Sequence, residues 1–207
     1  MLKAIDHPAT GTEAAQLGLA VCAAVDLTDF PRVGARGARS SQVMADAGYA
    51  LPSKPNQACV QDGGELLARL SASEFLLLCN VSQHASFGEG FTGEGLRDAE
   101  RFFRLERLDS HAWFLLCGMK SADVMAKMCG VDLREPQCPA GRVVQTSVAR
   151  INAIVVRQSV GRHDGLHILF DRSYLRYFRE ALVDAMQEFG GAFLEPQRVF
   201  KKALAVA

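Results

Sequence analysis

The sequence has no excess of charge of either sign. Its 207 residues include 23 Lys and Arg and 23 Asp and Glu, so the formal net charge is zero and the isoelectric point is about 7. Nucleic acids and acidic lipids attract proteins through a broad basic field, which this composition does not supply. Basic residues do recur at Arg101, Arg104 and Arg107. Because Glu100 and Glu106 neutralise much of that stripe, we expect no nucleic-acid partner.

Long hydrophobic runs are absent too. No stretch approaches the ~18 consecutive apolar residues that a membrane-spanning helix needs. The first ten residues contain no apolar block of the kind found in secretory signals. We therefore expect a cytoplasmic chain without a membrane partner. With 49% hydrophobic and 22% charged residues, the composition is typical of a globular protein.

Cysteine is present, but not in the patterns that bind metals or do redox chemistry. The chain has six cysteines and no Cys-x-x-Cys pair, at positions Cys22, Cys59, Cys79, Cys117, Cys129 and Cys138. The spacing of the last three matches no zinc pattern. We expect reduced thiols that are mostly buried, and no metal site.

The chain also lacks a recognisable catalytic arrangement. Nothing resembles the nucleophile turn of serine hydrolases. His163 and His167 are four residues apart, but Asp164 and Gly165 predict a turn between them, so the two rings do not share a helix face. A reactive cysteine would need a lowered pKa, which a sequence does not reveal. We predict no catalytic residues.

One glycine pattern, Gly88–Gly93, has the form G-x-G-x-x-G. In dinucleotide-binding folds this motif follows a strand directly and opens a helix. Here the preceding strand is predicted to end near Asn80, and Glu89 and Glu94 would repel a phosphate. We interpret the segment as a linker.

What the sequence does contain is an internal repeat. Gly37-Ala38-Arg39-Ser40-Ser41-Gln42-Val43-Met44-Ala45 resembles Gly118-Met119-Lys120-Ser121-Ala122-Asp123-Val124-Met125-Ala126, which begins 81 residues later. Glycine, serine and Val-Met-Ala occupy the same offsets. Two copies are too few for a solenoid, so the repeat indicates one fold built by duplication.

The elements around each copy predict an α+β fold of duplicated ferredoxin-like half-units, with helices packed against antiparallel sheets. Each half reads as strand, helix, proline-containing loop, hairpin and strand. We predict an N-terminal extension (1–20), a single domain (21–190) of two pseudo-repeats (about 21–85 and 99–190), and a C-terminal tail (191–207). Because an isolated half would leave one sheet face bare, the halves should pack together.

The candidate ligand residues are Cys138, Gly141 and Arg142, in the loop that leads to the second hairpin. Glycine permits a tight backbone, and arginine can hold a carboxylate. The first half has Asn56 and Gln57 at the equivalent place but no Cys-x-x-Gly-Arg. The simpler interpretation, a hairpin lead-in with a surface arginine, is the one that the pattern alone favours.

Several short motifs, in this order, resemble the folate-binding aminomethyltransferase superfamily, which includes the glycine-cleavage T-protein, and within it the gamma subunit of heterotetrameric sarcosine oxidase. The matching segments are Val25-Asp26-Leu27-Thr28-Asp29-Phe30 before Gly37, Leu70–Leu77, Leu115–Gly118, Cys129–Leu133, Pro139–Arg142 with Gln145-Thr146, and Arg172-Ser173-Tyr174.

The resemblance implies a subunit of an N-methyl amino acid oxidising complex, linked to folate one-carbon metabolism, that is not catalytic alone. Flavin and NAD would be bound by the other subunits, and folate is the one ligand this chain could itself hold. Two alternatives stay open: a stand-alone folate-binding protein of the YgfZ type, and a general protein-interaction module.

The sequence departs from those folate-binding relatives at the candidate site. They carry a Lys-Gly-Cys-Tyr-x-Gly-Gln-like stretch, whereas this chain reads Gln137-Cys138-Pro139-Ala140-Gly141-Arg142. The lysine, the aromatic residue and the glutamine are missing, and the chain is too short for the additional barrel of the T-protein.

Overall fold

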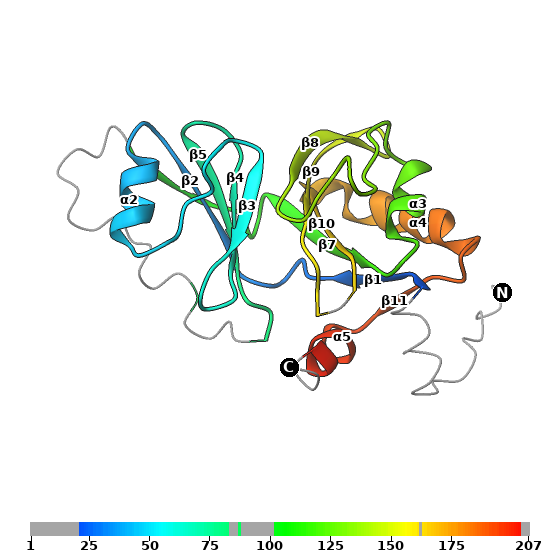
Figure 1. The fold of residues 1–207 in the computed structure, drawn as a ribbon. Helices are drawn as coiled ribbons and strands as arrows, with labels where there is room; N and C mark the ends of the chain where they lie inside the picture. Colours follow the sequence, from blue (N-terminus) through cyan, green and yellow to red (C-terminus); the bar gives the residue numbers. More distant parts are fainter. Residues whose placement is uncertain (1–20, 83–86, 88–101, 162, 204–207) are drawn as a thin grey trace.

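A computed structural model describes residues 21–82, 87, 102–161 and 163–203, which form two β-sheets that face each other (Figure 1). The first sheet has the strand order β3-β4-β5-β2-β6 and is antiparallel throughout. Its strands are β2 (Arg32–Arg36), β3 (Gln57–Val60), β4 (Leu66–Arg69), β5 (Glu74–Leu78) and β6 (Phe103–Glu106), and helix α2 (Ser40–Asp46) follows β2.

The second sheet has the order β11-β1-β7-β10-β9-β8. Its strands are β1 (Ala23–Asp26), β7 (His111–Cys117), β8 (Val143–Val148), β9 (Ile151–Arg157), β10 (Gly165–Asp171) and β11 (Ala192–Leu194). Helix α3 (Ser121–Ala126) follows β7, and helix α4 (Leu175–Gln187) follows β10 after the 3-10 turn Arg172–Tyr174. Only the β1–β11 pair is parallel among the strands described.

The two sheets repeat one topology. The order β3-β4-β5-β2 of the first corresponds to β8-β9-β10-β7 of the second, and α2 and α3 occupy equivalent places. The repeat glycines Gly37 and Gly118 both have positive φ angles, of 131° and 110°. Each lies between a strand and a helix, where Ser40 and Ser121 are buried. The α+β class with duplicated half-units is thereby confirmed.

The halves exchange one strand each. β1, the first strand of the first half, pairs with β7 of the second sheet. β6, the first strand of the second half, pairs with β2 of the first sheet. Each half (21–85 and 99–190) is continuous in sequence, but each sheet contains one strand that belongs to the other half.

The alternation of side chains along the strands produces three apolar layers. In β7, Phe114 and Leu116 pack under α3 and α4, whereas Trp113 and Leu115 point into the core between the sheets. Val33 and Phe75 belong to the third layer, on the face of the first sheet that α2 covers. The molecule is thus helix, sheet, sheet, helix, as Figure 1 shows.

A buried arginine holds the place where the exchanged strands cross. Arg32 is 2% exposed, and its guanidinium donates only to backbone carbonyls among the described residues. Four acceptors lie in the links between β1 and β2 and between β6 and β7, and the fifth is the first residue of β7. They are Thr28 (2.9 Å), Phe30 (2.8 Å), Arg107 (3.2 Å), Leu108 (3.0 Å) and His111. Burial lowers the pKa of Arg32 to about 10, so the group stays charged near neutral pH.

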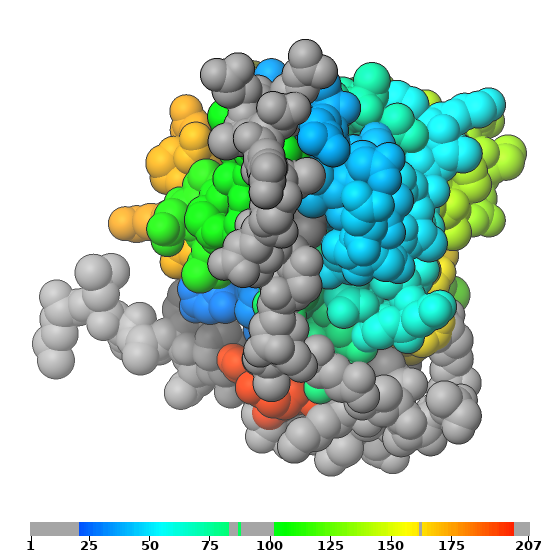
Figure 2. Space-filling view, turned by 90° about the vertical axis from the view of Figure 1, so that its left-hand side faces the viewer, coloured from blue at the N-terminus to red at the C-terminus, as the bar shows by residue number. Residues whose placement is uncertain are grey.

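The segment after residue 190, predicted as a tail, adds to this fold. β11 extends the second sheet beside β1, and α5 (Pro196–Ala203) buries Val199 against the core between the sheets. Viewed from the α2 side, α5 lies at the lower edge of the molecule (Figure 2). The predicted extension 1–20 and the motif Gly88–Gly93 lie outside the described residues.

Candidate functional site

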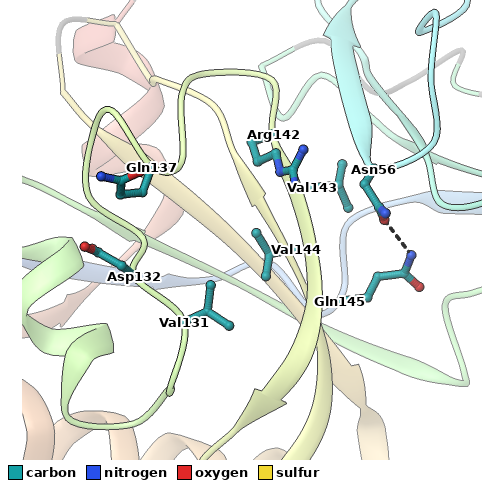
Figure 3. A pocket seen from close by; sticks show the side chains of 8 residues that line it. All are labelled: Asn56, Val131, Asp132, Gln137, Arg142, Val143, Val144 and Gln145. Carbon is teal, nitrogen blue, oxygen red and sulfur yellow. Dashed lines mark hydrogen bonds between the residues drawn. The ribbon is translucent and has the colours of Figure 1, made fainter.

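A pocket of about 260 Å³ lies against β8, where the two halves meet (Figure 3). It is lined by Asn56 from the first half, by three residues of the loop after α3, and by the start of β8. The lining residues are Asn56, Val131, Asp132, Gln137, Arg142, Val143, Val144 and Gln145. In Figure 3, Asn56 lies on one side of β8 and Val131, Asp132 and Gln137 lie on the other.

The pocket exists because the lead-in to β8 pairs with β3 across the boundary between the halves. Ala58 N–H donates to the Gly141 carbonyl at 2.7 Å, and Val143 N–H donates to the Asn56 carbonyl at 3.0 Å. Gly141 is required here, because its φ is +78° and a Cβ would lie 2.8 Å from the Ala58 oxygen. The equivalent loops of the two pseudo-repeats thus contact each other directly.

Two amides hold the first-half side of the pocket. Asn56 has a φ of +60°, a conformation that asparagine tolerates better than most residues. Gln145 Nε2 donates to Asn56 Oδ1 and to the Leu70 carbonyl, both at 2.8 Å. These bonds tie β8 to the first sheet and leave the amide side chains at the rim of the pocket.

The two charged residues in the lining differ in their pairing. Asp132 accepts from Arg134 Nε at 2.9 Å and Nη2 at 3.0 Å, and these hydrogen bonds lower the pKa of Asp132 to about 2. Arg142 is exposed, and its guanidinium has no hydrogen bond or ion pair with any other described residue. The pocket therefore presents one uncompensated positive charge, which suits a carboxylate.

Of the three sequence-predicted site residues, Arg142 lines the pocket, Gly141 shapes the backbone beside it, and Cys138 lies elsewhere. Cys138 is 1% exposed and belongs to the core beneath α3 and α4. Burial raises its pKa, although the charges of Arg157 and Arg142 act in the opposite direction. Cys138 is therefore a buried thiol rather than a pocket residue.

Three further buried thiols, those of Cys22, Cys79 and Cys117, are also protonated near neutral pH. Burial raises the pKa of Cys22 to about 11, of Cys79 to about 12 and of Cys117 to about 12. The thiolate is the nucleophilic form of cysteine, so these side chains pack as small apolar groups. All six cysteines are free thiols, as the sequence predicts.

The histidines that the structure describes do not form a cluster. His167 is a buried strand residue whose Nδ1 accepts from the Trp113 indole N–H at 3.2 Å. Burial lowers its pKa to about 4, so the ring is neutral near pH 7. His163 lies in a turn, bridged to Val160. The described ranges contain no group of three or more His, Cys, Asp or Glu that could hold a metal ion.

The predicted basic stripe is internally paired where the structure describes it. Arg104 contacts Glu106 at 2.8 Å, and Arg107 contacts Glu74 at 2.8 Å. Arg101 lies outside the described residues. No helix in the described part of the chain is long and apolar enough to span a membrane.

Sequence reasoning did not identify Asn56, Asp132 and Gln145 as pocket residues. The available signal was indirect: Asn56 follows two prolines in a turn, and it stands at the position equivalent to the candidate loop. Gln145 is a polar residue on a strand, which is ordinary in sequence terms. The pairing of Gln57 with Arg142 brings Asn56 to β8, and the bridge between Cys129 and Val148 holds the loop that carries Asp132 against the same strand.

Searches against known proteins match structures but not sequences. No protein-family profile and no curated protein matches the chain. A chain of the heterotetrameric sarcosine oxidase from Corynebacterium sp. U-96, in complex with pyrrole 2-carboxylate, is similar with a TM-score of 0.70 and 22% identity, over 88% of this chain and 94% of that chain.

A second similar structure is the glycine cleavage system aminomethyltransferase T from Bartonella henselae. Its TM-score is 0.66 and its identity 17%, over 89% of this chain and 50% of that chain. This chain thus spans about half the length of the aminomethyltransferase. At such identities both similarities establish the fold.

Proposed function

We propose that this chain is a non-catalytic, gamma-type subunit of a heteromeric, flavin-dependent oxidase of sarcosine or another N-methylated amino acid. The observation that carries the proposal is the extent of the similarity to a chain of heterotetrameric sarcosine oxidase. It covers 88% of this chain and 94% of that chain, so two chains of similar length match almost end to end. Two corresponding subunits would give such a match.

The chemistry of the described side chains supports a role in assembly rather than in bond breaking. The thiols of Cys22, Cys79 and Cys117 are protonated near neutral pH, because burial raises their pKa values. His167 is neutral and enclosed in the core between the sheets. In this proposal the partner subunits bind flavin and NAD, this chain binds neither, and the product enters folate-dependent one-carbon metabolism.

The test is to compare the purified chain with the same chain co-expressed with candidate oxidase subunits. We expect the chain alone to show no flavin absorbance and no oxidation of sarcosine. Together with its partners it should co-purify in a fixed ratio, and the complex should oxidise an N-methylated amino acid. Oxidation of sarcosine by the single chain would contradict the proposal.

A second candidate function, a stand-alone folate-binding protein, has one observation in its favour. The pocket at β8 combines the unpaired Arg142 with the amides of Asn56 and Gln145, and a guanidinium can bind the carboxylate of a glutamate tail. Its volume of about 260 Å³ is near the lower limit of small-molecule sites. It would therefore hold part of a folate molecule.

Calorimetric titration with folate decides this alternative. Binding should release heat, raise the melting temperature of the chain and weaken in the variant Arg142→Gln. No heat and no thermal shift at about 1 mM folate, where even weak binding is detectable, would remove the folate alternative. That result would leave the subunit proposal unaffected.

A further inference from the structure

Strand β8 is an unusually open sheet edge for this molecule. Exposed edge strands pair readily with other chains, and proteins guard them with short length, charge, proline or a covering element. In the described sheets, β11 has three residues and leads into α5, while β6 carries the Arg104–Glu106 pair. β8 has six residues, Val-Val-Gln-Thr-Ser-Val, with neither charge nor proline.

The hydrogen-bond alternation leaves specific backbone groups of β8 pointing outward. Opposite β9, the Arg142 carbonyl accepts from Arg157 N–H at 2.9 Å, so alternate residues from Arg142 onward bond to β9. The backbone N–H and C=O groups of the residues between them, Val143, Gln145 and Ser147, point away from β9. Val143 N–H is used by Asn56, but Gln145 N–H, Gln145 C=O and Ser147 N–H have no hydrogen-bond partner within the described chain.

Both ends of this open stretch are closed. At one end, Gln57 bridges to Arg142, and at the other, Cys129 bridges to Val148. Ala149 N–H also donates to the Met128 carbonyl at 2.9 Å. The outer edge of Val143–Ser147 is therefore a window recessed between two chain segments, which we call the β8 window. Figure 3 shows side chains of these flanking segments on either side of β8.

The recess determines what can enter. Pairing of two copies through their β8 edges would bring the flanking segments of each copy against those of the other, which disfavours that arrangement. A single extended polypeptide is narrow enough, and it carries backbone donors and acceptors at the same repeat as a strand. The pocket of about 260 Å³ at the window provides room for its side chains.

The charges that line the pocket indicate which kind of polypeptide segment would bind. Arg142, at the entrance, has no ion pair with a described residue, whereas Asp132 across the pocket is neutralised by Arg134. An acidic side chain near one end of the segment would pair with Arg142, and opposite charges that meet across an interface favour specific binding.

We propose that the β8 window binds a short, extended, acidic segment of a partner polypeptide. The segment adds a strand to β8, bonds to Gln145 and Ser147, and places a carboxylate against Arg142. This inference concerns the chemistry of the partner, and it stands whether or not that partner is an oxidase subunit.

The first test uses the full chain and a synthetic probe, the peptide acetyl-Glu-Val-Thr-Val-Thr-amide, which carries its one carboxylate side chain at one end. In the free chain we expect the backbone amides of Gln145 and Ser147 to exchange rapidly with deuterium, because nothing in the described fold holds them. The peptide should slow both amides at least tenfold while leaving Thr146, whose amide bonds to β9, nearly unchanged. Unaltered exchange at up to about 10 mM peptide, which occupies about nine-tenths of a site with a Kd of about 1 mM, would overturn the proposal.

The second test uses the matched variants Ser147→Pro and Ser147→Ala. Proline removes the outward N–H and is tolerated at edge positions that take no part in the ladder, whereas alanine keeps the N–H. We expect proline to weaken binding about fivefold, the effect of one net hydrogen bond, and alanine to leave it unchanged. Equal binding by both variants would place the peptide elsewhere and overturn the proposal, and the exchange test remains decisive if the proline variant fails to fold.

The third test concerns the charge and the competing occupant. Arg142→Gln and a Glu→Gln peptide should each weaken binding, and the two changes together should weaken it no further than either alone. Additive effects would contradict a direct contact. Protection of Gln145 and Ser147 that grows with protein concentration in the absence of peptide would show a second copy in the window and would also overturn the proposal.

Discussion

Arg32 shows how much one side chain contributes where two chain segments cross. Its guanidinium donates to five backbone carbonyls, and none of these bonds goes to a carboxylate. Lysine carries only three donors on a single nitrogen, so Arg32→Lys leaves at least two buried carbonyls unbonded. We expect a loss of about 3 kcal/mol in the free energy of unfolding, measured by urea denaturation.

Arg36→Lys is the matched control for this prediction. Arg36 lies on the same strand, but its side chain is exposed. The control should change the free energy of unfolding by less than about 0.5 kcal/mol. A loss at Arg32 no larger than that of the control would mean that the carbonyls find water or rearrange, and that the crossing does not depend on the guanidinium.

His167 gives the protein a defined dependence on pH. Its pKa is lowered from 6.5 to about 4 by burial, so between these values the unfolded chain binds a proton that the folded chain does not. The stabilisation of the folded chain that comes from keeping His167 neutral is fully present above pH 6.5 and is lost as the pH falls toward 4. Below pH 4 the free energy of unfolding no longer changes because of this group. By pH 4 the loss amounts to about 3 kcal/mol.

His167→Gln tests this dependence, because glutamine keeps an acceptor for the Trp113 indole N–H but does not titrate. We expect the variant to lose less stability than the wild type between pH 7 and pH 4.5 in urea titrations. Part of the dependence should remain, since burial and the charges of Arg107 and Arg32 also lower the pKa of His111 to about 4. Identical pH profiles would show that the unfolded and folded chains bind this proton equally.

Residue roles were the hardest feature to predict from the sequence. Arg142 was recognisable because arginine next to a Pro-Ala-Gly turn is a plausible anion ligand. Cys138, in the same motif, is buried beneath the helices, because the loop folds inward at that point. Asn56 and Gln145 are 89 positions apart, and only the junction between the halves gives them a shared surface.

At the scale of the elements, the requirement for glycine in the internal repeat has a clear physical basis. Gly118 has a φ of +110°, and a Cβ there would lie 2.6 Å from the Val21 oxygen. Gly48 also has a positive φ, of +86°, but a Cβ at that position would have no heavy atom within 4 Å among its non-neighbouring residues. Substitutions at Gly48 and Gly118 can therefore separate the cost of an unfavourable backbone conformation from the cost of a steric contact.

We expect Gly48→Ala to cost about 1 kcal/mol, the conformational penalty alone. Gly118→Ala should cost about 3 kcal/mol or more, because a contact with rigid backbone adds to that penalty. Thermal or urea denaturation of the pair measures the difference. Equal losses would show that the Val21 segment moves away at little cost and that the glycine is needed only for its φ angle.

The position of most elements along the chain can be predicted from the local pattern of side chains. Which strands pair with one another cannot be predicted in this way. The apolar run Phe75–Leu78 and the alternation in β7 predict buried strands, and α4 has a clear amphipathic stripe. Nothing local indicates that β1 pairs with β7, or that Ala192–Leu194 forms a parallel edge strand. Such pairings depend on contacts between residues far apart in the sequence, which the period of side chains does not encode.

At the scale of the whole molecule, the strand exchange predicts a single cooperative unit. Each sheet contains a strand from the other half, and one apolar layer is shared by both sheets. Trp113, the only tryptophan, lies in that layer. We expect tryptophan fluorescence and far-ultraviolet circular dichroism to change at the same urea concentration. Two separate transitions would show that the halves fold independently.

The duplication could be predicted from nine residues in each copy, but the relation between the copies could not. The sequence indicates that two similar units pack together, because neither could cover its own sheet. The exchange of β1 and β6 and the contact between equivalent loops at Gln57 and Arg142 arise only when both halves are present. The candidate pocket exists only because the two halves contact each other in this way.

The most direct test of the account is to purify this chain from its native cell under mild conditions, with a small affinity tag, and to analyse what elutes with it. If the chain is a gamma-type subunit, it elutes in a fixed ratio with larger subunits that carry flavin, and the eluted complex oxidises sarcosine or another N-methylated amino acid. Elution as a lone 22.5 kDa chain, without flavin and without oxidase activity, would contradict the central claim.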